Sequence, residues 1–524
     1  MGHATLSTTA APALDPALVD RLTRRLAATS GATATTRAPF TGAPLAELPL
    51  STADDVADAF TRARAAQRAW ARLSPRDRAR PFIRFHDLVL ARQDEILDIL
   101  QWETGKARRH AFDEVFDAAA GTLYHARSAP GLLRRRRAPG AMPVATRSYV
   151  HHQPKGAVAV ITPWNYPLSL PVGDAIPALL AGNAVVAKPD TQTALSALWA
   201  IDLLVEAGLP ENLWIPVVGE PADIGDALID HADYVAFTGS SATGSLIAQR
   251  AAARLIGCSA ELGGKNPSIV CADADIPWTV DGSVRACFSN AGQLCISMER
   301  LYVHDRVFDE FTDRFAAAVR RMELNARLDF TADMGSLTYA RQLDRVAAHV
   351  DDARAKGAEV LAGGNARPDL GPLFYEPTVL TGVEPSMAAC ADETFGPVVA
   401  VYRFSDEDEA IARANATEYG LNASVWTRDV ARGRRIAERI QAGTVNVNEG
   451  YGAAWASYAA PMGGMKRSGL GRRHGAEGLL RYTEPQTVAS QHYVSLAGTP
   501  GMDAATLARL LTAGARAMKG LRIR

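Results

Sequence analysis

One cysteine in an unusual setting is the first residue of this sequence that could carry chemistry. The stretch SNAGQLCIS places Cys295 behind Gly292 and Gln293 among small and polar residues, whereas cysteines of a hydrophobic core are usually flanked by Val, Leu or Ile. A thiolate is a strong nucleophile, and its pKa falls near backbone N–H groups or cations. Gly292 and Gln293 predict that the chain turns tightly into a helix-like backbone just before Cys295. This geometry would lower the pKa of the Cys295 thiol. Taken alone, the stretch is also compatible with an inert buried thiol.

Two more side chains could assist a nucleophile of this kind. Glu261, in SAELGGKNPSIV, precedes two glycines that let the backbone approach a ligand, and a carboxyl group in a semi-apolar site gains a raised pKa and can act as a general base. Asn165, in PWNYP, offers an amide that could form an oxyanion hole with the backbone N–H of Cys295. A helix-end carboxylate and an asparagine in a proline-bounded turn are the structural alternatives.

Two motifs suggest a phosphate-bearing cofactor. AFTGSSATG follows the strand-like YVAF and opens a helix, so that Gly239, Ser240 and Gly244 would let backbone N–H groups approach a phosphate. The motif is not G-x-G-x-x-G and is weak by itself, since an ordinary turn would look similar. Lys188, in VVAKPD, ends a strand at the edge where doubly wound sheets bind ligands, and could hold ribose hydroxyls or a phosphate; a solvated lysine is the alternative.

These features together suit the oxidation of an aldehyde. The thiolate of Cys295 would add to the carbonyl, Asn165 would stabilise the oxyanion, and hydride would leave to a nicotinamide. A water molecule activated by Glu261 would then hydrolyse the thioester. A cysteine hydrolase or acyl transferase is the alternative from another class, but no histidine motif accompanies Cys295, and the cofactor motifs would have no role.

The elements that must position these residues follow an alternating pattern. Residues from about 53 to 130 repeat apolar side chains at helical spacing. From Gly156 onward, strand-like runs such as GAVAVI, AVVAK and YVAF alternate with helical segments, and a second α/β block begins near 263. This alternation predicts βαβ units and parallel sheets, and hence an α/β fold.

Length and composition narrow the class of protein. A chain of 524 residues is too long for a single core and predicts two or three domains. With 48% apolar residues and a net charge of −1, nothing suggests a nucleic-acid partner. Five widely spaced cysteines without a C-x-x-C pair predict neither a disulfide framework nor a metal site. No signal peptide or run of membrane-spanning length is present, so we expect a cytoplasmic protein without an integral membrane segment.

The motifs and their order resemble the aldehyde dehydrogenase superfamily over nearly the whole chain. The matching stretches are ETGK (103–106), PWNYP, KPD, FTGSSATG, ELGGKNP, NAGQLC, ETFGPVV and PMGGMKRSGLGRRHGAEGLLRYTE. The resemblance implies a Rossmann-type dinucleotide-binding domain, an α/β catalytic domain and a small bridging β-sheet used for oligomerisation, in a homodimer or homotetramer. The corresponding segments are 1–140 with 155–262, then 263–483, and 141–154 with 484–496, followed by a C-terminal helical extension over 497–524.

The resemblance also implies the roles of individual residues. Cys295 would be the nucleophile, Glu261 the base and Asn165 the oxyanion donor. Glu393 would hold the nicotinamide ribose, with Phe395 beside the ring. The other residues implied at the cofactor are Trp164, Lys188, Pro189, Asp190, Thr191, Gly239, Ser240 and Leu262.

A departure from the family bears on the cofactor. NAD users of the family often carry a glutamate, which binds the adenosine ribose, where this chain has Thr191. Without that carboxylate a 2′-phosphate meets less repulsion, and Lys188 could pair with it. We therefore expect NADP, with NAD possible because Asp190 would repel the phosphate if it pointed inward.

A second departure bears on the substrate. The motifs look most like those of bacterial NADP-dependent succinate-semialdehyde dehydrogenases, but many such enzymes carry an arginine where this chain has Gly173, followed by Asp174. Arg300 is widespread in the superfamily and does not replace that arginine. The pocket candidates, which are Tyr166, Trp455 and Tyr458, suit benzaldehyde-type or aliphatic aldehydes equally. Ser297 stands where some relatives have a regulatory cysteine, so no disulfide switch is expected there.

The C-terminal extension has the pattern of an amphipathic helix. Leu507, Leu510, Leu511, Ala515 and Met518 share one face, and basic residues lie mostly elsewhere. A helix docked on the protein is the favoured interpretation, with a membrane-surface helix as the alternative.

Overall fold

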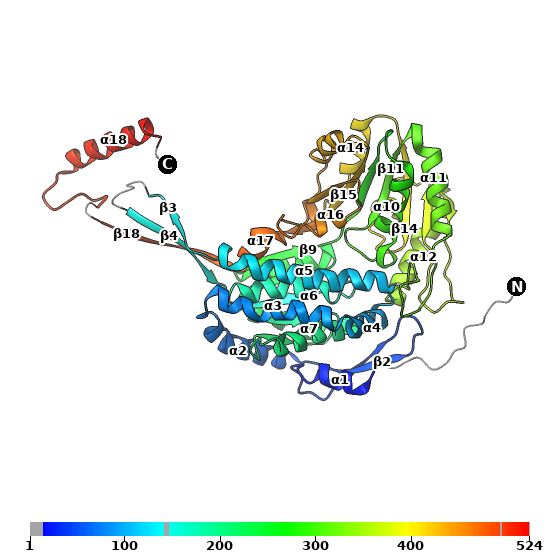
Figure 1. Cartoon of the computed structure of the whole chain (residues 1–524), viewed down its shortest axis with the longest axis horizontal. Helices are drawn as coiled ribbons and strands as arrows, with labels where there is room; N and C mark the ends of the chain where they lie inside the picture. The colour runs from blue at the N-terminus through cyan, green and yellow to red at the C-terminus, as the bar shows by residue number, and fades with distance from the viewer. Residues whose placement is uncertain (1–13, 141–145, 493–494, 523–524) are drawn as a thin grey trace.

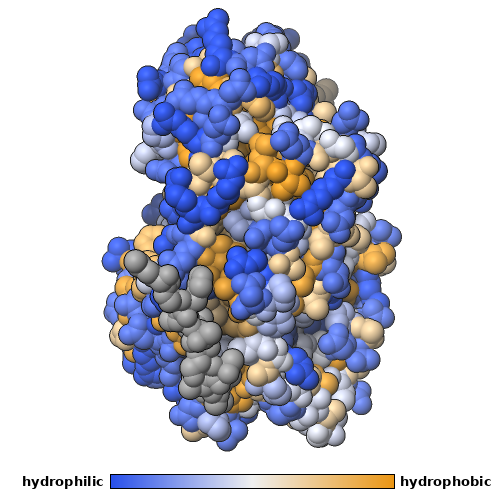
Figure 2. Space-filling model, turned by 90° about the vertical axis from the view of Figure 1, so that its right-hand side faces the viewer, coloured by the Kyte–Doolittle hydropathy of each residue, from blue (hydrophilic) through white to orange (hydrophobic). Residues whose placement is uncertain are grey.

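The structure is a computed structural model that describes residues 14–140, 146–492 and 495–522. Parts of the predicted segments 1–140, 141–154, 484–496 and 497–524 therefore lie outside the described residues. Within these ranges the strands form four sheets. Figure 1 shows two α/β lobes with a narrow sheet projecting from one of them, and Figure 2 shows a largely hydrophilic face with apolar patches near the waist between the lobes.

The first lobe is built on a six-stranded sheet whose order is β17-β9-β8-β5-β6-β7. Its strands are β5 (Ala157–Ile161), β6 (Ala184–Lys188), β7 (Trp214–Pro216), β8 (Tyr234–Thr238), β9 (Gly257–Glu261) and β17 (Gly469–Leu470). All neighbours are parallel except β17, which is antiparallel to β9. The cores of β5, β6 and β8 are buried throughout, as expected of parallel strands covered on both faces.

Helices cover this sheet in the alternating pattern that the sequence predicts. The helices that connect its strands are α6 (Ser169–Leu180), α7 (Ala194–Glu206), α8 (Pro221–His231) and α9 (Ser241–Ala253). The preceding helices are α1 (Pro16–Thr23), α2 (Ala53–Trp70), α3 (Pro75–Ala91), α4 (Gln93–Thr104) and α5 (Arg108–Leu132). A hairpin of β1 (Thr33–Arg37) and β2 (Pro44–Pro49) lies beside α1 in Figure 1.

The second lobe contains a seven-stranded sheet of order β12-β13-β14-β11-β10-β15-β16, parallel except for β12. Its strands are β10 (Asn266–Val270), β11 (Met298–His304), β12 (Glu359–Ala362), β13 (Thr378–Thr381), β14 (Val398–Phe404), β15 (Asn422–Trp426) and β16 (Thr444–Val447). Its helices are α10 (Ile276–Phe288), α11 (Asp305–Arg320), α12 (Ala340–Ala355), α13 (Ala388–Ala391), α14 (Glu407–Asn415), α15 (Val430–Ala437) and α16 (Gly452–Trp455).

The chain returns to the first lobe before it ends. β17 pairs with β9, and α17 (Gly475–Leu480) contacts α5 and α6. The predicted second segment, 263–483, therefore includes a stretch that belongs structurally to the six-stranded sheet. This return places the residues around 470 beside the end of β9, where Glu261 lies.

The projecting sheet consists of β18 (Thr483–Gln491), β4 (Thr146–Pro154) and β3 (Arg136–Ala138). β18 and β4 pair antiparallel from Thr483 opposite Pro154 to Gln491 opposite Thr146, which confirms the predicted pairing of these two segments. β3 was not predicted as a strand, and it adds a third strand from inside the segment 1–140.

The C-terminal helix α18 (Ala504–Gly520) does not pack on the body of the chain. None of its residues is buried, and Leu510 is 56% exposed. In Figure 1 it lies beyond the projecting sheet, away from both lobes. The prediction of a docked helix is therefore wrong for the single chain. Among the described residues no helix is long and apolar enough to cross a membrane.

Candidate active site

The residues predicted to carry chemistry lie around one cavity at the carboxyl ends of the parallel strands. Asn165 follows β5, and Glu261 ends β9. Cys295 arrives from the second lobe, in the turn before β11. The cavity is lined by all three of these residues. The structure thus brings together side chains that are up to 130 positions apart in the sequence.

The turn that carries Cys295 has an unusual backbone. Asn290 and Ala291 have φ of 53° and 54°, and Gly292 has a φ of 69°. A side chain at Gly292 would collide with the carbonyl oxygen of Gly396, so that only glycine fits there. Three consecutive residues in the left-handed region are rare and persist where the surroundings fix them. They end the short 3₁₀ turn η2 (Ser289–Gly292), so Cys295 does not approach a helix as predicted.

Side chains of the second lobe hold this turn in place. The amide of Asn266 donates to the carbonyl oxygens of Cys295 at 2.8 Å and Ser297 at 2.7 Å. A Cβ atom at Gly264 would lie 3.0 Å from the same Cys295 oxygen, which explains the need for a small residue in LGGKN. Because the turn is held on two sides, the thiol has a defined position at the wall of the cavity.

The pKa of Cys295 is raised to about 12, chiefly by burial and further by Glu393 and Glu261. The expectation of a lowered pKa is therefore wrong for this state of the protein. The desolvation of the thiolate outweighs the backbone N–H groups around it. A thiol of this kind needs a base within the cavity to become a nucleophile.

Glu261 is a carboxyl group suited to that role. It is buried, lines the cavity and has an Oε1 atom without a hydrogen-bond partner. Burial raises its pKa to about 7, against the lowering effect of Arg473 and Arg481. A general base works best with a pKa near the working pH. The raised pKa predicted for Glu261 is thus found in the structure.

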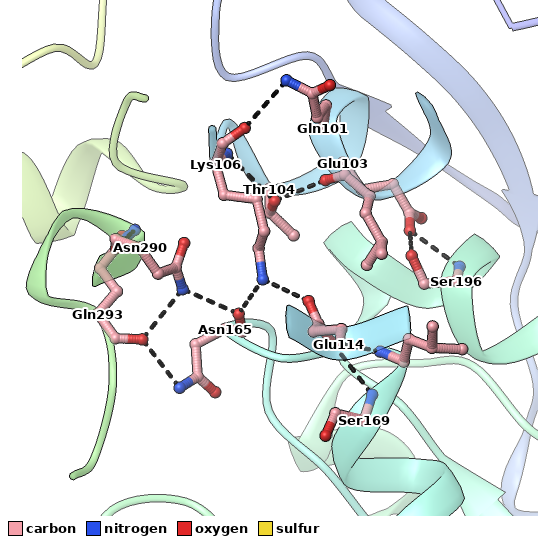
Figure 3. A network of polar contacts seen from close by, with 12 residues as sticks. Gln101, Glu103, Thr104, Lys106, Glu114, Asn165, Ser169, Ser196, Asn290 and Gln293 are labelled. Carbon is pink, nitrogen blue, oxygen red and sulfur yellow. Dashed lines mark hydrogen bonds and ion pairs between the residues drawn. The ribbon is translucent and has the colours of Figure 1, made fainter. Parts of the chain in front are cut away.

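Asn165 points its amide toward the cysteine turn. Its Nδ2 donates to the carbonyl oxygen of Gln293 at 3.0 Å, which leaves one N–H of the amide for another acceptor. Its backbone carbonyl accepts hydrogen bonds from Lys106 Nζ at 2.7 Å and from Asn290 Nδ2 at 3.0 Å. Figure 3 shows how this carbonyl joins the two lobes at the site.

A buried network behind Asn165 had no predicted role. Lys106 forms a fully buried ion pair with Glu114, whose other oxygen accepts from the N–H groups of Leu168 at 2.9 Å and Ser169 at 3.1 Å (Figure 3). Glu114 therefore binds the start of α6, just after Asn165. Of this network only Lys106 stood in a stretch singled out in the sequence, as part of ETGK.

Glu103 of the same motif has a separate structural role. It accepts hydrogen bonds from the N–H groups of Leu195 at 2.7 Å and Ser196 at 2.9 Å, and from the hydroxyl of Ser196. Its carboxyl group thus satisfies N–H groups at the start of α7. Burial raises the pKa of Glu103 to about 8.

The residues predicted to bind a cofactor surround the other side of the site. Lys188 ends β6 and is buried, and within the described part of the chain its ammonium group donates to the Pro189 carbonyl alone, at 3.3 Å. Burial lowers its pKa. Ser240, which follows Gly239, caps α9 by accepting from Thr243 N–H at 3.2 Å. The ammonium group of Lys188 and the N-terminus of α9 thus lie at the carboxyl ends of β6 and β8, which flank β5 in the sheet.

Asp190 is turned toward another residue. Its carboxylate accepts hydrogen bonds from the hydroxyl of Tyr339 and from the N–H of Gln192 at 3.0 Å. Thr191 begins the short turn η1 (Thr191–Thr193) directly after it. Asp190 is therefore engaged within the protein, while position 191 presents a hydroxyl group in place of a carboxylate.

Glu393 and Phe395 reach the site from the segment before β14. The Glu393 carboxylate accepts from Gly264 N–H at 2.9 Å, and burial raises its pKa to about 7. Phe395 has a φ of 54° and packs edge-to-face on Trp164, with ring centroids 5.5 Å apart. Leu262 N–H donates to the Ser468 carbonyl at 2.9 Å.

The remaining predicted pocket residues divide into two groups. Tyr166 and Trp455 line the cavity, and so does Gly173, where an added Cβ atom would have no atom within 4 Å. Tyr458 does not line it but donates to Asp117 at 3.0 Å. Asp113 and Asp117 also line the cavity. Both were missed by sequence analysis, because an aspartate on a helix is usually a solvated side chain.

Comparison with known proteins identifies the family. The sequence matches the aldehyde dehydrogenase family over residues 26–488. The chain belongs to the aldehyde dehydrogenase family. It is 53% identical, over 92% of its length and 93% of the relative, to a Mycolicibacterium smegmatis protein named "Putative succinate-semialdehyde dehydrogenase [NADP(+)]".

Solved structures of aldehyde dehydrogenases and related enzymes share this fold. An E. coli structure described as an NADP dependent enzyme superimposes with a TM-score of 0.85 at 34% identity, covering 88% of this chain and 96% of that one. The structure of PnpE in complex with nicotinamide adenine dinucleotide has a TM-score of 0.86 at 35% identity, covering 89% and 96%. The predicted α/β fold with its Rossmann-type sheet is therefore confirmed for this aldehyde dehydrogenase.

Proposed function

We propose that this aldehyde dehydrogenase oxidises succinate semialdehyde to succinate with NADP. The observation that carries the proposal is the convergence of Cys295, Asn165 and Glu261 on one cavity. Support for the substrate comes from the 53% identical relative that bears this activity in its name.

The chain's own residues account for each step of the reaction. The thiol proton of Cys295 passes to Glu261 as the sulfur adds to the aldehyde carbon, and the oxyanion accepts hydrogen bonds from Asn165 Nδ2 and the N–H of Cys295. NADP, when bound, supplies the acceptor for the hydride, and a thioester on Cys295 results. Glu261 releases the thiol proton to solvent and then takes a proton from water as the water oxygen attacks the thioester carbon. The C–S bond breaks, and the Cys295 thiolate regains a proton from Glu261.

The residues present fit NADP by the chemistry of their donors. Lys188 carries an ammonium group with only one weak protein acceptor, and Thr191 adds no negative charge. Asp190 is held by the hydroxyl of Tyr339, and its charge also acts on Lys188. Lys188 and the start of α9 would hold the phosphates, and Trp164, Leu262, Glu393 and Phe395 would flank the rest of the cofactor.

We expect Thr191→Glu to shift the preference from NADP toward NAD. A carboxylate there would repel the 2′-phosphate and could accept ribose hydroxyls. The ratio of kcat/KM for NADP over NAD should fall by about tenfold or more. A tenfold change corresponds to about 1.4 kcal/mol of repulsion between the new carboxylate and the 2′-phosphate. Thr191→Gln, which adds similar bulk without charge, is the matched control. An unchanged ratio in the glutamate variant would refute the 2′-phosphate argument.

A specific observation favours a second candidate substrate class. Gly173 leaves open space where an arginine would bind a carboxylate, and the cavity is lined by the aromatic rings of Tyr166 and Trp455. Asp113 and Asp117 add acidic groups to the cavity wall. Asp113 forms an ion pair with Arg285 at 3.7 Å. An uncharged benzaldehyde-type or aliphatic aldehyde is therefore the alternative substrate.

A series of aldehydes separates the two classes. We expect kcat/KM with NADP to be at least about tenfold higher for succinate semialdehyde than for butanal, which has the same chain length without the charge. Reduced-cofactor absorbance with purified enzyme measures both, with benzaldehyde and hexanal alongside. Faster turnover of butanal, hexanal or benzaldehyde would leave the aldehyde dehydrogenase activity intact and reject the specific substrate.

Two further proposals concern the setting of the enzyme. The projecting sheet of β3, β4 and β18 supports a homodimer or homotetramer, since eight of the nine residues of β18 are exposed in the single chain. All five cysteines are free, which supports a reducing cytoplasm.

A further inference from the structure

Arg473 shares the end of the six-stranded sheet with Glu261. It lies between β17 and α17, in the stretch that returns from the second lobe to the first. Its side chain is 11% exposed and lines the same cavity as Glu261 and Cys295. The sequence pattern GRRHG gives no sign that this arginine differs from its neighbour Arg472.

One side-chain contact and one backbone contact place Arg473 near Glu261. Arg473 Nη2 donates to Thr238 Oγ1 at 2.8 Å, and Thr238 is the cross-strand partner of Glu261 in the pairing of β8 with β9. Neighbouring strands lie about 4.8 Å apart. In addition, Met462 N–H donates to the Arg473 carbonyl at 2.8 Å, and a Cβ atom at Gly463 would lie 3.0 Å from Glu261 Oε1.

Both groups have an atom without a partner. Arg473 Nε and Glu261 Oε1 are buried and make no hydrogen bond, although most buried polar atoms in proteins are paired. The free N–H of one group and the free oxygen of the other therefore border the same cavity.

The position and charge of Arg473 are fixed from behind. Asp174, on α6, is 1% exposed and forms ion pairs with both Arg473 and Arg481. Two guanidinium groups thus share one carboxylate, and one positive charge remains in excess beside Glu261. An uncompensated buried charge is costly, so a second carboxylate close by is favourable.

We propose that Arg473 is a positioning residue for the general base: its guanidinium, fixed by Asp174 and Thr238, holds the ionised carboxylate of Glu261 at the cavity. This role rests on the proposed function, in which Glu261 activates the water that hydrolyses the thioester. Arg473 acts through Glu261 and forms no bond to the substrate.

The direction of the pH effect follows from the charges that face Glu261. They are Arg472 and Arg473 from the returning stretch, Arg481 at the end of α17, Asp174 on α6 and Cys295. Burial raises the pKa of Glu261, and Arg473 is the strongest of the groups that oppose this rise. The base must be ionised to act, so hydrolysis should increase with pH through the pKa of Glu261. Loss of Arg473 should move that rise to higher pH.

The test compares Arg473→Met with Arg473→Lys in the full-length enzyme. Rapid mixing with NADP and succinate semialdehyde, or with the best aldehyde found, gives a burst of NADPH and a steady-state rate across pH. We expect Arg473→Met to keep a burst of about one NADPH per site and to lose about tenfold of the steady-state rate near neutral pH. The steady-state rate of this variant should rise at a pH about one unit or more above that of the wild type.

Two variants act as controls. Arg473→Lys keeps the charge and should retain the wild-type pH dependence. The Arg472 guanidinium donates to the carbonyls of Gly464 and Gly471 and opposes the rise of the Glu261 pKa less than Arg473 does, so Arg472→Met should shift the pH dependence by less than Arg473→Met. A folded Arg473→Met variant with the wild-type pH dependence would overturn the proposal. If that variant does not fold, Arg473→Gln replaces it, with the same required shift.

The proposed function fails in a different way from this inference. If the wild type forms no NADPH from any aldehyde, the reaction itself is wrong. If the wild type is active and the pH dependence of the rate is the same with and without the positive charge at position 473, only the proposed role of Arg473 is wrong.

Discussion

Cys295→Ala is expected to abolish aldehyde oxidation while NADP binding is retained. Removal of an essential nucleophile costs about 10⁴-fold or more in kcat, and no other cysteine among the cavity-lining residues of the structure can replace the thiol. Alanine fits because the turn is held by Asn266 and by its left-handed backbone, neither of which involves the thiol. NADPH formation and binding of NADP, followed by fluorescence, measure the two properties separately.

The matched control for this variant is Cys390→Ala. Cys390 is partly buried in α13, outside the cavity, and its loss should leave kcat within about twofold. Turnover retained by Cys295→Ala would reject the mechanism. Loss of both turnover and NADP binding would show that the substitution disturbs the site as a whole, and Cys295→Ser, with nearly the same shape, would then have to show the selective loss.

The positions of the catalytic side chains could be predicted because parallel strands align their ends. β5, β6, β8 and β9 carry PWN, KPD, FTGS and ELGG at their carboxyl ends, and the structure brings these ends to one edge. β5, β6 and β8 were recognisable as short apolar runs between helical segments, whereas β9, with the sequence GCSAE, was not predicted as a strand. The approach of Cys295 from the second lobe followed from the family resemblance, since no local pattern links it to β5 or β9.

Other features depend on contacts that a single sequence does not contain. The pKa of Cys295 is set by burial between two lobes, so local residues gave the wrong direction. The buried pair of Lys106 and Glu114 joins residues whose pairing depends on how α5 meets the loop after β5. The strands β12, β13 and β15 are short, and neither their length nor their flanks separated them from loops.

The terminal helix shows the limit of a periodic pattern. An apolar stripe indicates that a helix can pack against something, but it does not say what covers it. In α18 no residue of the stripe is buried within the single chain, and a Cβ atom at Gly498 in the preceding turn would lie 3.4 Å from Leu507. Arg473 illustrates the same limit, because the position of its side chain depends on Thr238 and Asp174 in other elements.

Glu261→Gln is expected to stop the reaction after the first turnover. Glutamine has the shape of the carboxyl group but cannot accept a proton from water, so hydrolysis should slow by about 10²–10⁴-fold. Formation of the thioester still needs the thiol proton to leave, and at alkaline pH solvent can accept it because the pKa of Cys295, raised to about 12, allows a small thiolate fraction. The variant should therefore release about one NADPH per site and then stall.

The stalled species gives this prediction its sharpest test. Mass spectrometry of the quenched variant should show one acyl group on Cys295. Hydroxylamine attacks a thioester without a general base, so, added after the excess aldehyde is removed, it should release the acyl group as a hydroxamate and free the thiol. Steady-state oxidation at the wild-type rate would show that another group activates water. A variant with no burst even at alkaline pH would show instead that solvent cannot replace Glu261 as the acceptor of the thiol proton.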